Sequence, residues 1–307
     1  MKIAVFCATR RGLRVLGRVL DLARGASFVV FSFREAAGEP LFFDDIRMLA
    51  ADAGAEFFEA RRVDVPELMA YWKTAGADLM LAVHWRYLIP SEVFRHARLG
   101  AYAFHDALLP AYRGFSPTVW ALINGETKTG ATLFELGDSV DSGGIIGQQE
   151  VLIGPEEPIA PVMEKVTGAY LSLIETHLPA LLLGTAERHP QNESLATYTC
   201  KRVAADNRID WTRPWSEIFN LIRALSRPYA GAFTLLGPRQ LRVWGAKPAA
   251  ERRYIGRIPG RVVEIRKGEG AVVLCGNGAL LLTELELEGD EIKPGDLVLD
   301  RLSLTLG

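Results

Sequence analysis

The sequence predicts a doubly wound, mostly parallel α/β sheet followed by a small β-barrel domain. Three patterns support this prediction. Short buried strands alternate with helical patterns over the first 150 residues, which is typical of a parallel sheet with helices on both faces. A long amphipathic helix is expected over residues 159–183, ended by Gly184. The last third carries short strand-like runs punctuated by Gly, Pro and Asn, as in small barrels.

In the first domain, four β-rich runs have the length of buried strands. They are Lys2–Cys7, Phe28–Phe33, Asp78–Val83 and Gly100–His105. Between them, apolar residues recur at helical spacing. These helical patterns cover Leu13–Leu22, 43–53 and 65–75. The regular alternation therefore places the carboxyl ends of the strands at one edge of a sheet.

The polar, turn-rich segment 186–208 is a candidate linker. It predicts one domain over residues 1–205 and a second over 206–307. The second domain opens with a helix over Trp215–Leu225. Five strands are then expected, at Ala232–Leu236, Gln240–Ala246, Gly260–Ile265, Ala271–Cys275 and Ala279–Leu285.

Composition narrows the class of protein. The 307 residues are 49% hydrophobic and 23% charged, and the formal net charge is −2, so nothing favours a nucleic acid or membrane partner. The N-terminus lacks the apolar region of a signal peptide. Three cysteines without CxxC spacing argue against a disulfide framework or a zinc site. We expect a cytoplasmic protein with no metal.

Two segments carry the chemical signal. His105 ends a predicted parallel strand, where open α/β sheets bind their ligands. Asp141 lies in the glycine-flanked loop 136–144 between two strands. A His and an Asp on adjacent loops are suited to proton transfer. No HExxH, P-loop or GxGxxG motif is present in the sequence.

These segments resemble motifs of the folate-dependent N-formyltransferases. The run 103–114 (AFHDALLPAYRG) is similar to the family pattern Asn-x-His-x-Ser-Leu-Leu-Pro followed by Arg-Gly, and loop 136–144 is similar to its Asp-x-Gly loop. The stretch GETKTGAT at 125–132 and the segments from Gln191 to Tyr229 are also of family type. The C-terminal domain is similar to that of methionyl-tRNA formyltransferase and the aminoarabinose transformylase.

The resemblance implies N10-formyltetrahydrofolate as the formyl donor. His105 would stabilise the oxyanion formed when an amine attacks the formyl carbon. Asp141 would keep His105 charged and help to move the proton from the amine to the folate nitrogen. The implied folate-binding residues are Trp85, Arg86, Tyr87, Leu88, Ile89, Gly137, Asp138, Ser139, Val140 and Asp141.

One position departs from the family pattern, because Ala103 stands where the family has Asn. A methyl group cannot supply the amide N–H that the Asn directs at the oxyanion, and losing such a donor costs about 10²–10³ in rate. The chain is then impaired, uses another donor, or has an altered activity, including that of a binding module. Asp106, beside His105, is expected to point outward and cap the turn.

The acceptor amine is expected to belong to an amino-sugar nucleotide. Arg10 and Arg11 follow the first strand at the start of a helix, where they would meet a pyrophosphate. Tyr112 and Arg113 are further acceptor-site candidates. Methionyl-tRNA and another small amine are the alternative acceptors. Segment 34–49 has two Arg against four acidic residues and so lacks the basic surface that tRNA requires. A homodimer through an exposed C-terminal β-hairpin is also conceivable.

Overall fold

The computed structural model describes residues 1–36, 38–250 and 252–307, which form two compact units. Unit 1 comprises residues 1–114, 129–151 and 164–199, and unit 2 comprises 115–128, 152–163 and 200–307. The sequence placed the domain boundary near residue 205. In the structure, unit 1 ends at Thr199, and unit 2 also takes the two earlier segments 115–128 and 152–163.

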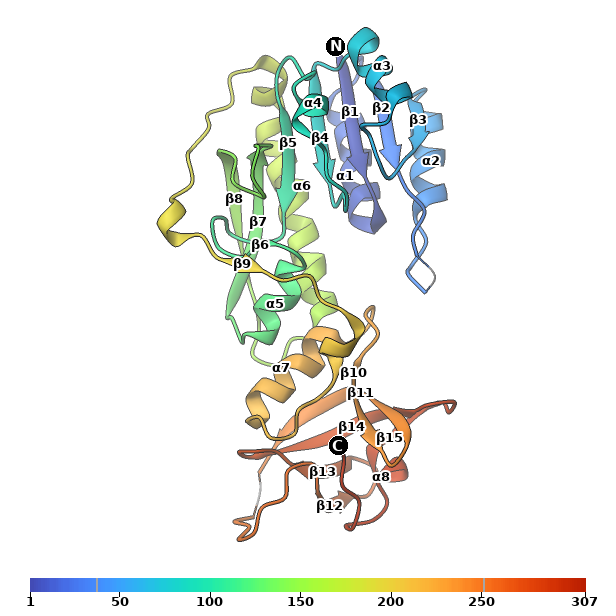
Figure 1. Ribbon diagram of the computed structural model, residues 1–307, viewed down its shortest axis with the longest axis vertical. Coiled ribbons are helices and arrows are strands. Elements are labelled where there is room, and N and C mark those ends of the chain that lie inside the picture. Colours follow the sequence, from blue (N-terminus) through green and yellow to red (C-terminus); the bar gives the residue numbers. More distant parts are fainter. Residues whose placement is uncertain (37, 251) are drawn as a thin grey trace. The chain divides into compact units, whose positions relative to one another are not determined.

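Unit 1 is built on a seven-stranded sheet of order β3-β2-β1-β4-β5-β7-β8 (Figure 1). The strands are β1 (Lys2–Cys7), β2 (Ser27–Ser32), β3 (Glu56–Glu59), β4 (Leu79–Val83), β5 (Ala101–His105), β7 (Lys128–Glu135) and β8 (Ile145–Leu152). The pairs among β1 to β5 are parallel, and β7 runs antiparallel to β5. The predicted mostly parallel sheet is confirmed.

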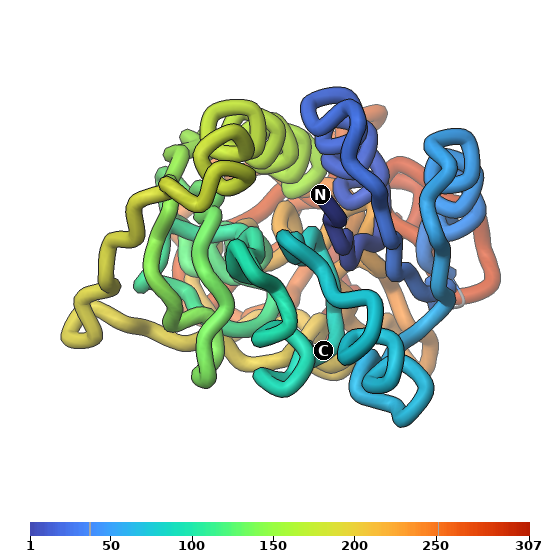
Figure 2. The backbone as a smooth tube through the Cα atoms, turned by 90° about the horizontal axis from the view of Figure 1, so that it is seen from above, coloured from blue at the N-terminus to red at the C-terminus, as the bar shows by residue number. Residues whose placement is uncertain are grey.

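Helices cover both faces of this sheet. They are α1 (Thr9–Leu22), α2 (Phe43–Asp52), α3 (Pro66–Ala75), the short α4 (Ser91–Phe94) and α6 (Ile159–Leu183). One core contains apolar side chains of α1, α2 and α6, and a second contains those of α3 and α4. Figure 2 shows α1 and α6 on one side of the sheet and the segment of α3 and α4 on the other.

The helix α6 is long and apolar enough, by length and composition, to be a candidate membrane span. Its Val166, Ile174 and Leu178 are fully buried in the first core. This burial identifies α6 as a core helix of unit 1, since the same test is passed by buried helices of globular domains.

Side chains alternate along β5, so successive residues point to opposite faces of the sheet. Tyr102 and Phe104 belong to the core under α1 and α6, whereas Ala101 and Ala103 belong to the core under α3 and α4. His105 continues the second set, and Asp106 continues the first.

Unit 2 is an antiparallel sheet of order β10-β11-β14-β13-β12, with β15 paired to β14. Its strands are β10 (Ala232–Leu236), β11 (Arg239–Ala249), β12 (Val262–Arg266), β13 (Gly270–Leu274), β14 (Ala279–Leu287) and β15 (Ile292–Pro294). Its helices are α5 (Pro117–Ile123), α7 (Trp215–Leu225) and α8 (Gly295–Val298), with a 3₁₀ turn η2 (Ala204–Asn207).

Residues 304–307 connect the two end strands of this sheet. Leu304 O accepts from Val262 N in β12, and Gly307 exchanges two backbone hydrogen bonds with Leu235 in β10. These bonds close the sheet into the barrel that the sequence predicts. The helix α5 packs against α7, so an element from the first half of the chain belongs to the barrel unit.

Candidate active site

His105 is the last residue of β5, and its side chain is buried. Its Nε2 lies 2.7 Å from the backbone carbonyl oxygen of Tyr112. Because a carbonyl only accepts hydrogen bonds, Nε2 carries a proton and donates it to this oxygen. The orientation of the ring is therefore fixed by the chain that follows β5.

Asp141 approaches His105 from the loop between β7 and β8. Its Oδ2 lies 3.5 Å from Nδ1 of His105 and accepts a hydrogen bond of 2.8 Å from the backbone N–H of Gly114. Two residues that are far apart in the sequence thus meet at one edge of the sheet. Gly143 allows the loop to close, because a Cβ there would lie 1.7 Å from the carbonyl oxygen of Glu135.

This arrangement is suited to accepting a proton. With Nε2 protonated and the ring neutral, Nδ1 presents a lone pair toward a carboxylate oxygen, so two acceptors face each other. A proton placed between Nδ1 and Oδ2 would convert this repulsion into a charge-assisted hydrogen bond. The pair can therefore take up a proton released nearby and give it back.

Ala103 lies two residues before His105, on the same face of β5. It pairs with Ala82 and Phe134 on the neighbouring strands and is buried in the core that contains Phe134. Its methyl group supplies no hydrogen-bond donor to the site.

The predicted folate segment 85–89 follows β4. Trp85 contacts the rings of Phe6 and Phe33 at centroid distances of 5.6 and 5.3 Å. Its buried Nε1 has no hydrogen-bond partner among the described residues, which is unusual for a buried donor. Leu88 is 80% exposed, while Ile89 is buried.

Three other predicted folate residues contact side chains of the protein. Arg86 forms an ion pair of 2.7 Å with Glu39, and the Tyr87 ring packs against Phe33. In the loop after β7, Asp138 forms an exposed ion pair of 3.2 Å with Arg95. Gly137, Ser139 and Val140 are exposed.

Arg11 lies in the first turn of α1 and is 4% exposed. Its guanidinium forms an ion pair with Asp106, donates to Thr167 Oγ1 at 3.1 Å and stacks on the Tyr170 ring. Arg11 is thus held inside unit 1. The acceptor role predicted for this residue is not supported by its burial.

The expectation that Asp106 points outward is wrong. Asp106 accepts hydrogen bonds from Arg11 and from the Tyr170 hydroxyl. Burial by itself raises the pKa of Asp106, but the Arg11 charge, His84 and the Tyr170 hydroxyl together hold it well below its usual range. Strand alternation explains the direction, since Asp106 continues the face of β5 that lies under α1 and α6.

Arg10 differs from its neighbour. Its side chain is 62% exposed and forms an ion pair of 2.9 Å with Glu164, which also binds Arg14. Such exposed pairs are weak, so the Arg10 guanidinium can exchange partners at small cost.

Arg113 is 1% exposed, and five hydrogen bonds match its five N–H donors. Its partners are Gln191 Oε1, both carboxylate oxygens of Glu193 and the Tyr198 hydroxyl. These bonds hold Arg113 to its own chain and leave its guanidinium no N–H donor for a ligand.

Tyr112 precedes Arg113 and has a φ of +61°. Its backbone N–H donates a hydrogen bond of 2.8 Å to Thr197 Oγ1.

His84 was not singled out in the sequence. It follows β4 with a φ of +53°, and its Nδ1 lies 3.0 Å from Oγ1 of Thr9, which has a φ of +64°. Burial, followed by the Arg11 charge, lowers the pKa of His84 to about 4, so the ring is neutral near pH 7. The sequence signal for this position was its place directly after a parallel strand, where open α/β sheets bind their ligands.

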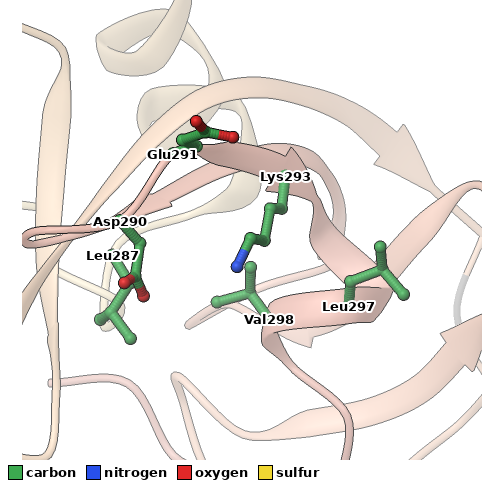
Figure 3. Close-up of a pocket in the computed structure, with 6 residues that line it drawn as sticks. All are labelled: Leu287, Asp290, Glu291, Lys293, Leu297 and Val298. Carbon is green, nitrogen blue, oxygen red and sulfur yellow. The ribbon is translucent and has the colours of Figure 1, made fainter.

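Two surface hollows lie in unit 2, away from these residues in the sequence. The one in Figure 3 has a volume of about 130 Å³ and is lined by Asp290, Glu291 and Lys293 among others. The other has a volume of about 490 Å³ and is lined by residues 208–212, Pro259, Leu306 and Gly307. In the described parts of the chain, no cluster of three or more His, Cys, Asp or Glu is placed to hold a metal ion.

Sequence comparison identifies two matching family models. The model described as "Formyl transferase" matches residues 11–174, and the model described as "Formyl transferase, C-terminal domain" matches residues 202–300. Together they cover both predicted domains.

Several solved structures share the fold. An N-formyltransferase from Helicobacter canadensis, in complex with folinic acid and dTDP-3-aminofucose, is 14% identical with a TM-score of 0.66 and covers 92% of this chain and 98% of its own. A sugar N-formyltransferase from Shewanella sp. is 19% identical with a TM-score of 0.61, and the alignment covers 78% of this chain and 93% of the Shewanella chain.

HypX from Aquifex aeolicus in complex with tetrahydrofolic acid is 19% identical with a TM-score of 0.64, and 96% of this chain aligns. The chain spans about half the length of the HypX structures, since the alignment covers 46% of that protein. At these low sequence identities, the structural similarity shows that this chain shares the fold of these proteins.

The two adjacent arginines of α1 provide a matched test of the buried ion pair. Replacing Arg11 leaves the Asp106 carboxylate buried without its main partner, so Arg11→Met should lower the free energy of unfolding by roughly 3–5 kcal/mol. Arg10→Met removes only an exposed pair and should cost less than about 1 kcal/mol. Urea unfolding measures both. Adding Asp106→Asn to Arg11→Met should restore part of the loss, and equal effects of the two single variants would contradict the assignment.

Proposed function

Because the chain belongs to the formyl transferase family, we propose that it transfers the formyl group of N10-formyltetrahydrofolate to the amine of a nucleotide-linked amino sugar. The observation that carries the proposal is the contact between His105 Nδ1 and Asp141 Oδ2, at 3.5 Å and at the carboxyl edge of the sheet. Formyl transfer to an amine needs a proton acceptor of this kind.

The chemistry requires one proton to move. A bond forms between the amine nitrogen and the formyl carbon, and the bond from that carbon to the folate nitrogen breaks, so the amine loses a proton and the folate nitrogen gains one. The Nδ1–Oδ2 pair takes up the first proton and returns it to the leaving nitrogen. While that proton is on Nδ1 and hydrogen bonded to Asp141 Oδ2, the ring carries a positive charge that stabilises the negative charge developing on the formyl oxygen.

The residues after β4 and β7 fit a folate. N10-formyltetrahydrofolate supplies the formyl group, and its pterin is a flat heterocycle with hydrogen-bonding edges. The Trp85 Nε1–H, which has no hydrogen-bond partner in the described part of the chain, offers a donor to such an edge. Ile89 offers apolar surface, and the exposed loop 137–140 lies next to Asp141 in the sequence. Tetrahydrofolic and folinic acid in two of the fold relatives support this assignment.

A nucleotide-linked amino sugar is favoured as acceptor for two reasons. The Helicobacter relative is in complex with dTDP-3-aminofucose, and the net charge of −2 gives no general attraction for a nucleic acid. In this chain, Arg10 is an exposed cation at the start of α1 and is our candidate to bind the pyrophosphate of the acceptor. Tyr112 stays a candidate for the acceptor site, whereas the buried Arg11 and Arg113 position the chain.

Ala103 supports a second candidate function. A chain that lacks the amide donor at this position can bind folate or nucleotide and turn over slowly or not at all. On this alternative, the protein acts as a binding module of the same family.

The proposal is tested by incubating the protein with N10-formyltetrahydrofolate and a panel of amino-sugar nucleotides. We expect one or more acceptors to gain the mass of one CO by mass spectrometry, and dTDP-linked amino sugars are the first to examine. Methionyl-tRNA is included in the panel. Formylation of the tRNA alone would replace the acceptor assigned here, and binding of folate without any product would favour the binding module.

Position 103 offers a sharper prediction. Ala103→Asn places an amide two residues before His105 on the same face, so it should donate to the oxyanion and raise kcat by roughly 10²-fold with little change in folate affinity. Steady-state kinetics with the best acceptor measure this. Ala103→Leu is the matched control, because it has the shape of Asn without its N–H. An equal response of the two variants, or no gain with Asn, would mean that another group already supplies the donor.

A further inference from the structure

The segment 189–199, which we call the strap, lies beside the loop of Asp141. It begins with His189, whose backbone exchanges hydrogen bonds of 2.9 and 2.8 Å with Ile145 at the start of β8. It includes the 3₁₀ turn η1 (Glu193–Leu195) and ends in β9 (Tyr198–Thr199), which pairs in parallel with β6 (Arg113–Gly114). The sequence predicted this segment as part of a linker. In the structure it is part of unit 1 and touches both sides of the candidate site.

Gln191 is the strap residue that contacts the Asp141 loop. Its Nε2 donates to the carbonyl oxygens of Asp141 and Gly143, at 2.7 and 2.8 Å. Its Oε1 accepts from Nε and Nη2 of Arg113, at 3.1 and 2.7 Å. These four bonds use the two donors and two acceptor positions of a primary amide. The amide orientation is determined, because Arg113 can only donate.

Arg113 holds this amide in place. The arginine is buried, and Glu193 binds its guanidinium through both carboxylate oxygens at 2.7 and 2.8 Å. Hydrogen bonding to Glu193 raises the pKa of Arg113 above its usual range, so the donors facing Gln191 are permanent. The next residue, Gly114, donates its N–H to Asp141 Oδ2.

The backbone of Asp141 needs such support. Its φ is +49°, in the left-handed region that non-glycine residues rarely occupy. Strained residues of this kind persist only where the surroundings fix them. From this conformation the Asp141 carboxylate faces Nδ1 of His105. The two hydrogen bonds from Gln191 Nε2 hold the turn at both ends, at the carbonyl oxygens of Asp141 and Gly143.

We infer that Gln191 is a positioning residue for the proton-transfer pair: its amide holds Asp141 in the conformation from which the carboxylate meets His105. Gln191 acts through the backbone of Asp141, with Arg113 as its support, and does not touch the reacting atoms. The expected effect of Gln191 on kcat rests on the proposed function. Its expected effect on the position of Asp141 rests on the geometry alone.

The test replaces the donor end of the amide. Gln191→Glu keeps the size and the acceptor for Arg113, but puts a carboxylate oxygen against two carbonyl oxygens. We expect kcat for formyl transfer to fall by roughly 10- to 100-fold, with KM for N10-formyltetrahydrofolate changed less than about twofold. In the protein without substrate, we expect the ¹⁵N NMR signals of the His105 ring to shift, because Asp141 no longer faces Nδ1.

Gln149→Glu is the matched control, since it makes the same change at an exposed position of β8 and should leave kcat and the His105 signals unchanged. Gln191→Met, which removes the donors without adding charge, replaces Gln191→Glu if that variant does not fold, and should change kcat and the signals in the same direction. Unchanged His105 signals in a folded Gln191 variant would overturn the inference, even if no acceptor were ever formylated. Shifted signals with no formyl transfer by the wild-type protein would retain the positioning role and reject the proposed function.

Discussion

The candidate site depends on one carboxylate oxygen. Oδ2 of Asp141 accepts the N–H of Gly114 and lies 3.5 Å from Nδ1 of His105. It thereby joins the end of β5, the chain at β6 and the loop between β7 and β8. Since Nε2 of His105 is bound to Tyr112 O, Nδ1 is the ring nitrogen that can take up a proton, and it faces this oxygen. The position available to a transferred proton follows from these contacts.

Two buried arginines frame this pair without taking part in it. Arg11 binds Asp106, the residue after His105, and Arg113 binds the strap that supports Asp141. The Arg113 guanidinium has a partner for each N–H donor, and that of Arg11 is buried against Asp106, Thr167 and Tyr170, so both act on the site through rigidity. In the proposed function, Arg10 and Leu88, which are exposed, are candidates to meet ligands. Separating buried support from exposed recognition in this way is typical of preorganised sites.

Sequence patterns predicted the elements well because their signals are local. The strands β1, β4 and β5, the helices α1, α6 and α7, and the barrel strands β10 to β14 lie where apolar periodicity indicated, whereas the short β15 was not predicted. The family resemblance is confirmed. The roles of Arg11, Arg113 and Gln191 were not predictable. Arg113 meets Glu193 across 80 residues and Arg11 meets Asp106 across 95; no spacing rule connects such pairs. The same limit applies to α5, which packs against a helix that lies far along the chain.

In the proposed formyl transfer Asp141 accepts a proton through His105, and we would test this role with Asp141→Asn. The amide oxygen of Asn can still accept the Gly114 N–H, but the side chain cannot take up a proton near neutral pH. The measurement is kcat for formylation of the best acceptor, with binding of N10-formyltetrahydrofolate followed in parallel. We expect kcat to fall by about 10²–10⁴-fold while folate binding is retained. A kcat within about threefold of the wild-type value, under conditions where chemistry limits the rate, would contradict it.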